Sequence, residues 1–144
     1  MVETNELRIG NYILCNKMLA MVQGVLEDSV LIDGKVVVAN NAFIRPIALC
    51  DIILQKVRQK MPMPGRLRYL YYKNRPTFLI FENEGGGYYI GMNYEDDVVR
   101  ITPNPIVYLH QLQNIYFAQY GIEMDINVKV LFDSIETALE NGEI

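Results

Sequence analysis

The length and composition of the chain suit one globular domain, or two small halves that share a core. Its 144 residues are 51% hydrophobic and 21% charged, with a formal net charge of −4, which argues against a disordered protein. Cys15 and Cys50 lack CxxC spacing, and the N-terminus lacks the basic and apolar regions of a signal peptide. We therefore expect a reduced, cytoplasmic protein. The uncharged stretch 101–122 is too rich in proline and amide residues to cross a membrane.

Residues 1–49 are predicted to form a small β-barrel half. Short apolar runs alternate with turn residues, and Asp33-Gly34 is typical of a two-residue hairpin turn. Gly24 interrupts one run, where we expect the strand to bend or another backbone to approach closely. The five expected strands span residues 7–14, 18–26, 30–32, 36–38 and 43–47. This pattern favours a strongly bent barrel of the SH3 type over the alternative, a plain curved meander.

Residues 50–65 are predicted to form a connecting helix and a proline-rich connector. Ile53, Leu54 and Val57 recur at helical spacing, so a short helix should begin near Asp51 and extend over 50–60. The sequence MPMPG at 61–65 cannot continue it, because proline fixes the backbone and removes a hydrogen-bond donor. The main internal boundary is therefore expected here, within one compact domain overall.

Residues 66–121 are predicted to form an antiparallel β-meander covered by a helix. The four expected strands span residues 66–72, 77–82, 88–92 and 98–101. The helix should begin at Asn104 as N-cap, with Pro105 in its first turn, and should end at Gly121 in the left-handed conformation. Its apolar arc, expected in the core, comprises Tyr108, Leu109, Leu112, Ile115, Tyr116 and Tyr120.

Residues 122–144 are predicted to be a C-terminal extension with one short helix. The chain should remain extended from Ile122 to Leu131. Asp133 followed by Glu136 is typical of a helix N-cap and its N3 partner, so a helix over 134–140 should follow and end at Asn141-Gly142. With strands and helices segregated in this way, the whole chain is expected to be an α+β protein.

Three segments carry a resemblance to known proteins: LRIGNYI at 7–13, IRPIAL at 44–49 and LHQLQNIYFAQYGIEM at 109–124. They resemble a family of uncharacterised proteins from Bacteroides-type bacteria and their prophages, with its LRIGN strand, PIPL-like segment and HQLQNLYFALTGEEL element. This chain departs from that pattern at Gln119-Tyr120 and Ile122, and continues further after Asp125. The family has no assigned chemistry, so the resemblance implies a bacterial or phage origin and a cytoplasmic setting but transfers no site residues.

The basic residues gather in the middle of the chain. Seven of the thirteen lysines and arginines lie between residues 56 and 75, with no acid among them. Cations beside an aromatic ring are typical of single-stranded nucleic-acid surfaces. The alternative is that the cations pair with acids of the chain or are solvated. The candidate nucleic-acid residues, on strand 66–72 and in the turn after it, are Arg66, Arg68, Tyr72, Lys73 and Arg75.

The polar side of the 104–121 helix is a second candidate surface. It offers one imidazole and several amides, with an aromatic ring near its edge, from His110, Gln111, Gln113, Asn114 and Phe117. Such a face is either hydrated or bonds to a neighbouring subunit or partner protein. Together with the ten tyrosines, it leads us to expect a homo-oligomer.

Residue types suited to catalysis are sparse. His110 is the only histidine, and Cys15 and Cys50 lack an activating motif, so both cysteines are interpreted as small core residues. One histidine and two unrelated cysteines are a poor zinc ligand set. The run Gly85-Gly86-Gly87 opens no helix and lacks a following lysine, which indicates a hairpin tip and not a phosphate cradle.

The acidic residues after the basic segment could hold a divalent ion or supply a carboxylate pair, although a solvated turn is more typical. They are Glu82, Glu84, Glu95, Asp96 and Asp97. We expect no cofactor and no metal. The patterns favour a non-catalytic binding or interaction protein of bacterial or prophage origin. A nucleic-acid-binding accessory protein is the first alternative, and a metal-dependent hydrolase is the second.

Overall fold

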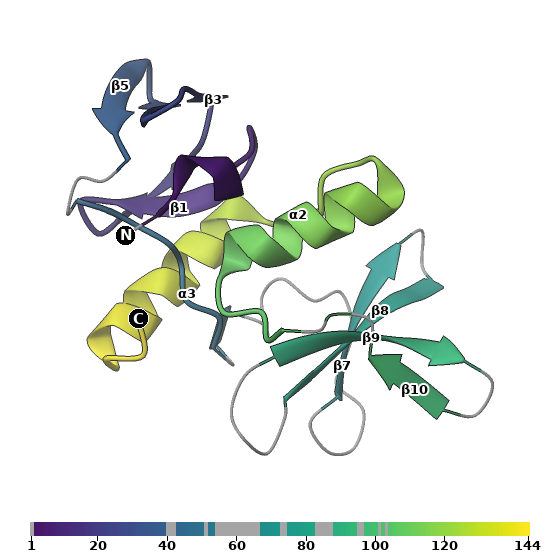
Figure 1. Ribbon diagram of the computed structural model, residues 1–144. Coiled ribbons are helices and arrows are strands. Elements are labelled where there is room, and N and C mark those ends of the chain that lie inside the picture. The colour runs from purple at the N-terminus through teal and green to yellow at the C-terminus, as the bar shows by residue number, and fades with distance from the viewer. Residues whose placement is uncertain are drawn as a thin grey trace. The chain divides into compact units, whose positions relative to one another are not determined.

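Figure 1 shows the computed structural model of the chain. The chain divides into two compact units. Unit 1 comprises Met1–Ala48, Tyr108–Asp125 and Leu139–Ile144, and unit 2 comprises Leu49–Val107 and Ile126–Ala138. The described residues are 2–39, 43–50, 52–53, 67–72, 75–82, 88–94, 97–100, 102 and 104–144. Within 67–82 and 92–100 only the backbone is described.

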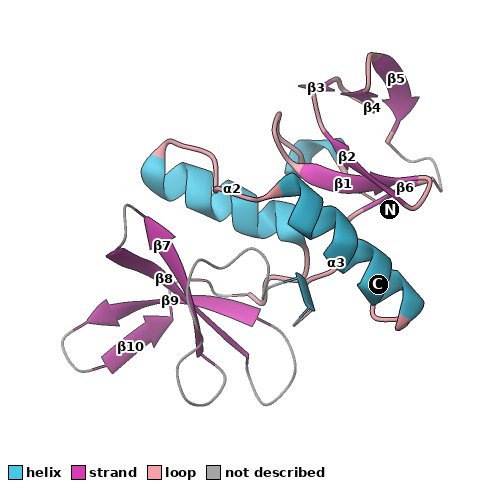
Figure 2. Ribbon diagram, turned by 180° about the vertical axis from the view of Figure 1, so that it is seen from behind, coloured by secondary structure: helices cyan, strands magenta, loops and turns pink. Residues whose placement is uncertain are grey.

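Unit 1 contains two antiparallel three-stranded sheets, in the orders β2-β1-β6 and β3-β4-β5. Figure 2 shows their strands in magenta, with the 3₁₀ helix η1 (Thr4–Glu6) preceding them. The strands are β1 (Tyr12–Cys15), β2 (Met18–Met21), β3 (Gly24–Val25), β4 (Ser29–Ile32), β5 (Lys35–Val38) and β6 (Ile44–Arg45). The expected hairpin at Asp33-Gly34 is confirmed, with φ values of 50° and 74° that suit a primed turn.

One segment of unit 1 takes part in both sheets. The run predicted as a single strand at 18–26 divides into β2 and β3 at Val22 and Gln23. Val22 donates its N–H to the Asn11 carbonyl, and Gln23 donates to the Leu31 carbonyl, both at 2.8 Å. A Cβ at Gly24 would lie 3.3 Å from the Leu31 Cβ. The small residue therefore lets the second sheet begin directly after the first.

The two sheets of unit 1 share one apolar core. Side chains from β1, β2, β4 and β6 pack together with two residues that precede β1 and one that follows β2. The cluster comprises Val2, Leu7, Ile13, Ala20, Val22, Val30, Ile32 and Ile44. Removing these side chains from water is the main force that holds the short strands together. The pairings of the described residues leave both sheets open, so a closed barrel stays a prediction.

Helix α2 (Leu109–Tyr120) also belongs to unit 1, where it contacts β1. The predicted end at Gly121 is confirmed, because this residue has φ 69° and donates its N–H to the Phe117 carbonyl. The predicted start at Asn104 is wrong. Tyr108 is the N-cap, and its backbone stays extended because it bridges Ala48, while Leu109 donates to the Ile47 carbonyl at 2.8 Å. Tertiary pairing therefore overrides the local capping signal.

The apolar arc of α2 is partly confirmed. Leu109, Leu112 and Tyr116 are buried as expected, whereas Tyr108 and Ile115 are only half-buried. Two polar residues, His110 and Gln113, are buried instead. The buried surface of this helix is therefore wider than its apolar arc.

Unit 2 contains the predicted antiparallel meander. All four expected strands are confirmed, in the order β10-β9-β8-β7. They are β7 (Leu67–Tyr72), β8 (Arg75–Glu82), β9 (Tyr88–Tyr94) and β10 (Asp97–Arg100). Ile52 and Ile53 are helical, and the rest of the helix and connector predicted at 50–65 lies outside the described residues. The helix expected to cover the meander stays a prediction, while the α+β class is confirmed.

Helix α3 spans Val128–Glu140, so the prediction of an extended chain to Leu131 is wrong. Asn127 begins the helix, since its side-chain oxygen accepts the Val130 N–H at 3.2 Å and its carbonyl accepts the Leu131 N–H. The expected cap Asp133 lies inside the helix. The buried stripe at i, i+3, i+4 and i+7 comprises Leu131, Ser134, Ile135 and Ala138.

Candidate functional site

The polar side of α2 faces the loop that precedes β1, within unit 1. Gln113 is 1% exposed, and both ends of its amide are bonded. Its side-chain oxygen accepts the Tyr12 N–H at 2.9 Å, and its Nε2 donates to the Gly10 carbonyl at 3.1 Å. The side chain thus satisfies one backbone group at the start of β1 and one in the loop before it.

Two asparagines extend this network toward the N-terminus. The buried Asn11 accepts the Arg8 N–H at 2.7 Å and donates through Nδ2 to Asn114 Oδ1 at 2.8 Å. Asn114 in turn donates to the Glu6 carbonyl at 2.9 Å. We call Asn11, Gln113 and Asn114 the amide latch. It joins the LRIGNYI segment to the HQLQN segment, which are two of the three segments that carry the resemblance described above.

Arg8 closes the outer end of the amide latch. Its guanidinium pairs with the Glu123 carboxylate and donates through Nε to Asn114 Oδ1 at 3.2 Å. Its Cζ atom lies 4.0 Å from the centre of the Phe117 ring. A cation over an aromatic face contributes about 0.5–2 kcal/mol, depending on its exposure to water. The arginine therefore fixes the loop to the C-terminal half of α2.

The contacts of α2 within unit 1 test part of the predicted interface. The expectation that the polar face of α2 is open to water or to a partner is wrong for His110 and Gln113, which are buried inside unit 1. Asn114 and Phe117 have the partners described above, within the same unit. Gln111 is half-buried and accepts the Tyr108 N–H at 3.1 Å, as a capping residue. A role for these residues toward a second subunit stays a prediction.

His110 is fully buried, and within the described part of the chain neither ring nitrogen has a hydrogen-bond partner. Its Nε2 lies 3.7 Å from Glu6 Oε2, and its ring stacks on Tyr108 with 5.7 Å between centroids. Burial lowers the pKa of His110, and the nearby Glu6 carboxylate opposes this shift. Burial therefore disfavours the charged form of this imidazole.

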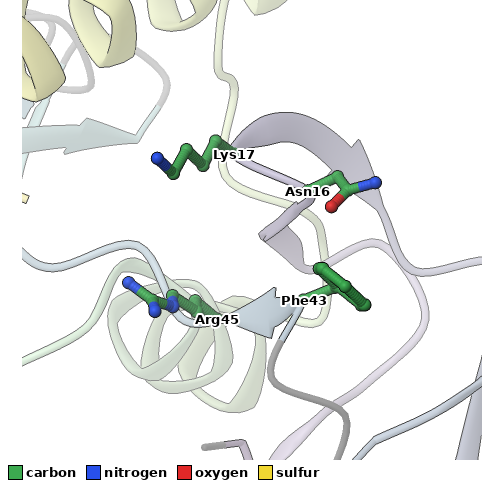
Figure 3. A pocket seen from close by; sticks show the side chains of 4 residues that line it. All are labelled: Asn16, Lys17, Phe43 and Arg45. Carbon is green, nitrogen blue, oxygen red and sulfur yellow. The ribbon is translucent and has the colours of Figure 1, made fainter.

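A pocket of about 280 Å³ opens beside the β1–β2 turn of unit 1. Its described lining residues are Asn16, Lys17, Phe43 and Arg45, shown in Figure 3. Asn16 donates its N–H to the Phe43 carbonyl at 2.8 Å, and β6 pairs with β1 through Leu14 and Arg45. We call this feature the turn pocket. The candidate residues drawn from the sequence did not include its members.

The remaining predicted sites fall largely outside the described residues. Side chains of the basic strand (Arg66, Arg68, Tyr72, Lys73 and Arg75) and of the acidic residues (Glu82, Glu84, Glu95, Asp96 and Asp97) are not described. Among the residues that are described, no group of three or more histidine, cysteine, aspartate or glutamate side chains could hold a metal ion. Cys15 packs against the apolar core of unit 1, as predicted for a core residue.

The chain matches no protein-family model, no curated protein and no solved structure. Among the described helices, none has the length and apolar character that crossing a bilayer requires.

Proposed function

We propose that this protein is a non-catalytic binding or interaction protein of bacterial or prophage origin, acts in the cytoplasm, and associates with itself. The observation that carries the proposal is the exposed apolar surface of unit 1. Its members lie on β2, β3 and β5 or next to them: Met18, Met21, Val25, Leu26, Val36 and Val38. All three strands lie at sheet edges. Sheet edges that carry exposed apolar side chains can pair with another chain.

Strand β5 is the best candidate for the contact itself. In the described part of the chain it pairs only with β4, and Val36 is 62% exposed. Edge strands of monomeric proteins are usually protected by charges, proline or bulges, but after Lys35 this strand continues with three valines. Two copies of β5 could pair antiparallel about a two-fold axis and cover each other's valines.

Sedimentation of the full chain tests this proposal. Wild-type protein should be dimeric at tens of micromolar, and Val36→Lys should be monomeric, because lysine places a charge in the proposed contact. Ile122→Lys is the matched control, since Ile122 is also exposed but follows α2 in the sequence and belongs to no strand. A monomeric wild type, or equal dissociation by both lysines, would contradict self-association through β5.

We also infer that the two sheets of unit 1 form a small barrel of the SH3 type. Counting β2 and β3 as one bent strand gives five strands, of which the second takes part in both sheets. The shared core and the orders β2-β1-β6 and β3-β4-β5 support this inference.

The second candidate function is that of a nucleic-acid-binding accessory protein. Nucleic-acid binding by the basic strand at 66–75 stays a proposal, because the side chains of this strand are not described. A separate observation now favours the same class of function. The turn pocket brings two cations and an aromatic ring together in unit 1.

A further inference from the structure

The two cations of the turn pocket have no partner among the residues that the structure describes. Arg8 elsewhere in unit 1 is fully engaged by Glu123, Asn114 and Phe117, whereas Lys17 and Arg45 make no ion pair and no side-chain hydrogen bond within the described part of the chain. No acidic residue is among the described residues that line the pocket. In Figure 3 the lysine ammonium and the arginine guanidinium lie on the same side of the pocket. Their positive charge is therefore available to an anion from outside.

Lys17 occupies a position that glycine would fill with less strain. The β1–β2 hairpin turns through Asn16 and Lys17, with φ values of 56° and 65°. Such turns favour asparagine followed by glycine, because a Cβ is disfavoured in the left-handed region. The other two-residue hairpin of unit 1 does end its turn in glycine, at Asp33-Gly34. The strained backbone therefore carries a side chain that lines the turn pocket.

The Phe43 ring indicates which class of anion fits the pocket. Its side chain is 58% exposed, and its backbone is held beside the turn by the hydrogen bond from Asn16. An acidic peptide or free phosphate would engage the two cations but would give the aromatic ring no role. A nucleic-acid strand uses all the groups, since a base can stack on the ring, phosphates can meet Lys17 and Arg45, and the Asn16 amide can reach a base edge.

We propose that the turn pocket is a binding site for single-stranded nucleic acid. This inference deepens the second candidate function, nucleic-acid binding, and does not rest on self-association. The chain as a whole is acidic, with a net charge of −4, so the attraction must be local to the pocket. Binding should accordingly involve few phosphates and depend only moderately on salt.

Fluorescence anisotropy with a labelled oligothymidylate of about ten nucleotides tests the site. Wild-type full chain should bind it at low salt. With two phosphate contacts and about 0.7 counterions released at each, log affinity against log salt should fall with a slope of roughly −1.4. Lys17→Gly should weaken binding and bring the slope to roughly −0.7. Its melting temperature should stay equal or rise by a few degrees, because glycine relieves the turn.

Two further variants separate stacking from charge. Phe43→Leu keeps an apolar side chain but cannot stack, so affinity should fall at least about fivefold. Arg45→Ala should repeat the charge effect of Lys17→Gly at a position without backbone strain. Lys129→Ala is the matched control, because Lys129 is an exposed lysine of α3 that belongs neither to β5 nor to the described residues that line the pocket.

Each outcome supports or overturns the site. Weaker binding in the three pocket variants, with Lys129→Ala unchanged, supports it. No binding at tens of micromolar protein, or equal losses in Lys17→Gly and Lys129→Ala, overturns it. If polyglutamate competes as well as the oligonucleotide and Phe43→Leu has no effect, the pocket takes acidic peptides and the proposal fails. The oligomeric state is measured separately by sedimentation. A failure of nucleic-acid binding is therefore distinguishable from a failure of self-association.

Discussion

The amide latch and the turn pocket both present polar side chains in unit 1, but they differ in what those side chains contact. In the latch, the amides of Asn11, Gln113 and Asn114 are bonded within the chain, largely out of contact with water. In the turn pocket, Lys17 and Arg45 are exposed and have no ion pair in the described residues. Polar residues that have internal partners hold the fold together, whereas those without partners are available for binding.

Leu112→Ala should give the largest loss of stability, because it removes a side chain from the buried face of α2. Its side chain is fully buried, so removal leaves a cavity and should lower the free energy of unfolding by about 2–5 kcal/mol. Urea unfolding measures this loss. An unchanged midpoint would show that α2 does not pack as described.

Gln113→Ala should be nearly as costly, by roughly 2–4 kcal/mol, because it leaves the Tyr12 N–H and the Gly10 carbonyl without their partner. Gln119→Ala is the control, since Gln119 is an exposed glutamine of the same helix and should change stability by less than about 0.5 kcal/mol. Equal, small effects in the two variants would mean that the latch contributes no more than a solvated surface.

His110 should make stability depend on pH. Its pKa is lowered from 6.5 in the fold, so on acidification the unfolded chain takes up a proton that the folded chain resists. Stability is thus fully present above the unfolded pKa and is lost as pH falls through the folded pKa. As pH falls below about 6.5, the loss is at most about 1.4 kcal/mol per pH unit for one group. His110 is the only histidine of the chain. The free energy of unfolding of His110→Leu should therefore lose this dependence on pH. If the free energy of unfolding of His110→Leu kept the same slope against pH, the pH dependence would belong to other groups.

Lys17→Gly should give the smallest change in stability, with the opposite sign. Relief of the left-handed backbone should raise the free energy of unfolding by up to about 1 kcal/mol. Thermal melting of the variant beside wild type measures the change. A clear loss of stability would instead assign Lys17 a structural role and would weaken the contrast with the latch.

Local signals predicted the parts of the fold that depend on local chemistry. The Asp33-Gly34 hairpin, the end of α2 at Gly121 and the strands of the meander all follow from turn residues and alternation. The start of α2 did not follow from the cap at Asn104, because residues 106–109 bond to distant segments. The start of α3 was signalled by Asn127 and by the spacing of Leu131, Ile135 and Ala138, a pattern that the sequence interpretation overlooked.

The candidate sites were harder to predict for a physical reason. Periodicity places His110 and Gln113 on a polar arc but cannot distinguish a solvated arc from one bonded to another segment of the chain. Lys17 and Arg45 are far apart in the sequence and come together because β6 pairs with β1. Asn16-Lys17 between two apolar runs is a turn signal, but nothing in the sequence places Phe43 beside it.

A double-mutant cycle between Asn11 and Asn114 tests the central claim, that the LRIGNYI and HQLQN segments form one buried latch. The free energy of unfolding is measured for wild type, Asn11→Ala, Asn114→Ala and the double variant. Because the two side chains share a hydrogen bond of 2.8 Å, the account predicts that the double variant loses less than the sum of the single losses, by about 0.5–3 kcal/mol. Single losses that simply add would contradict it.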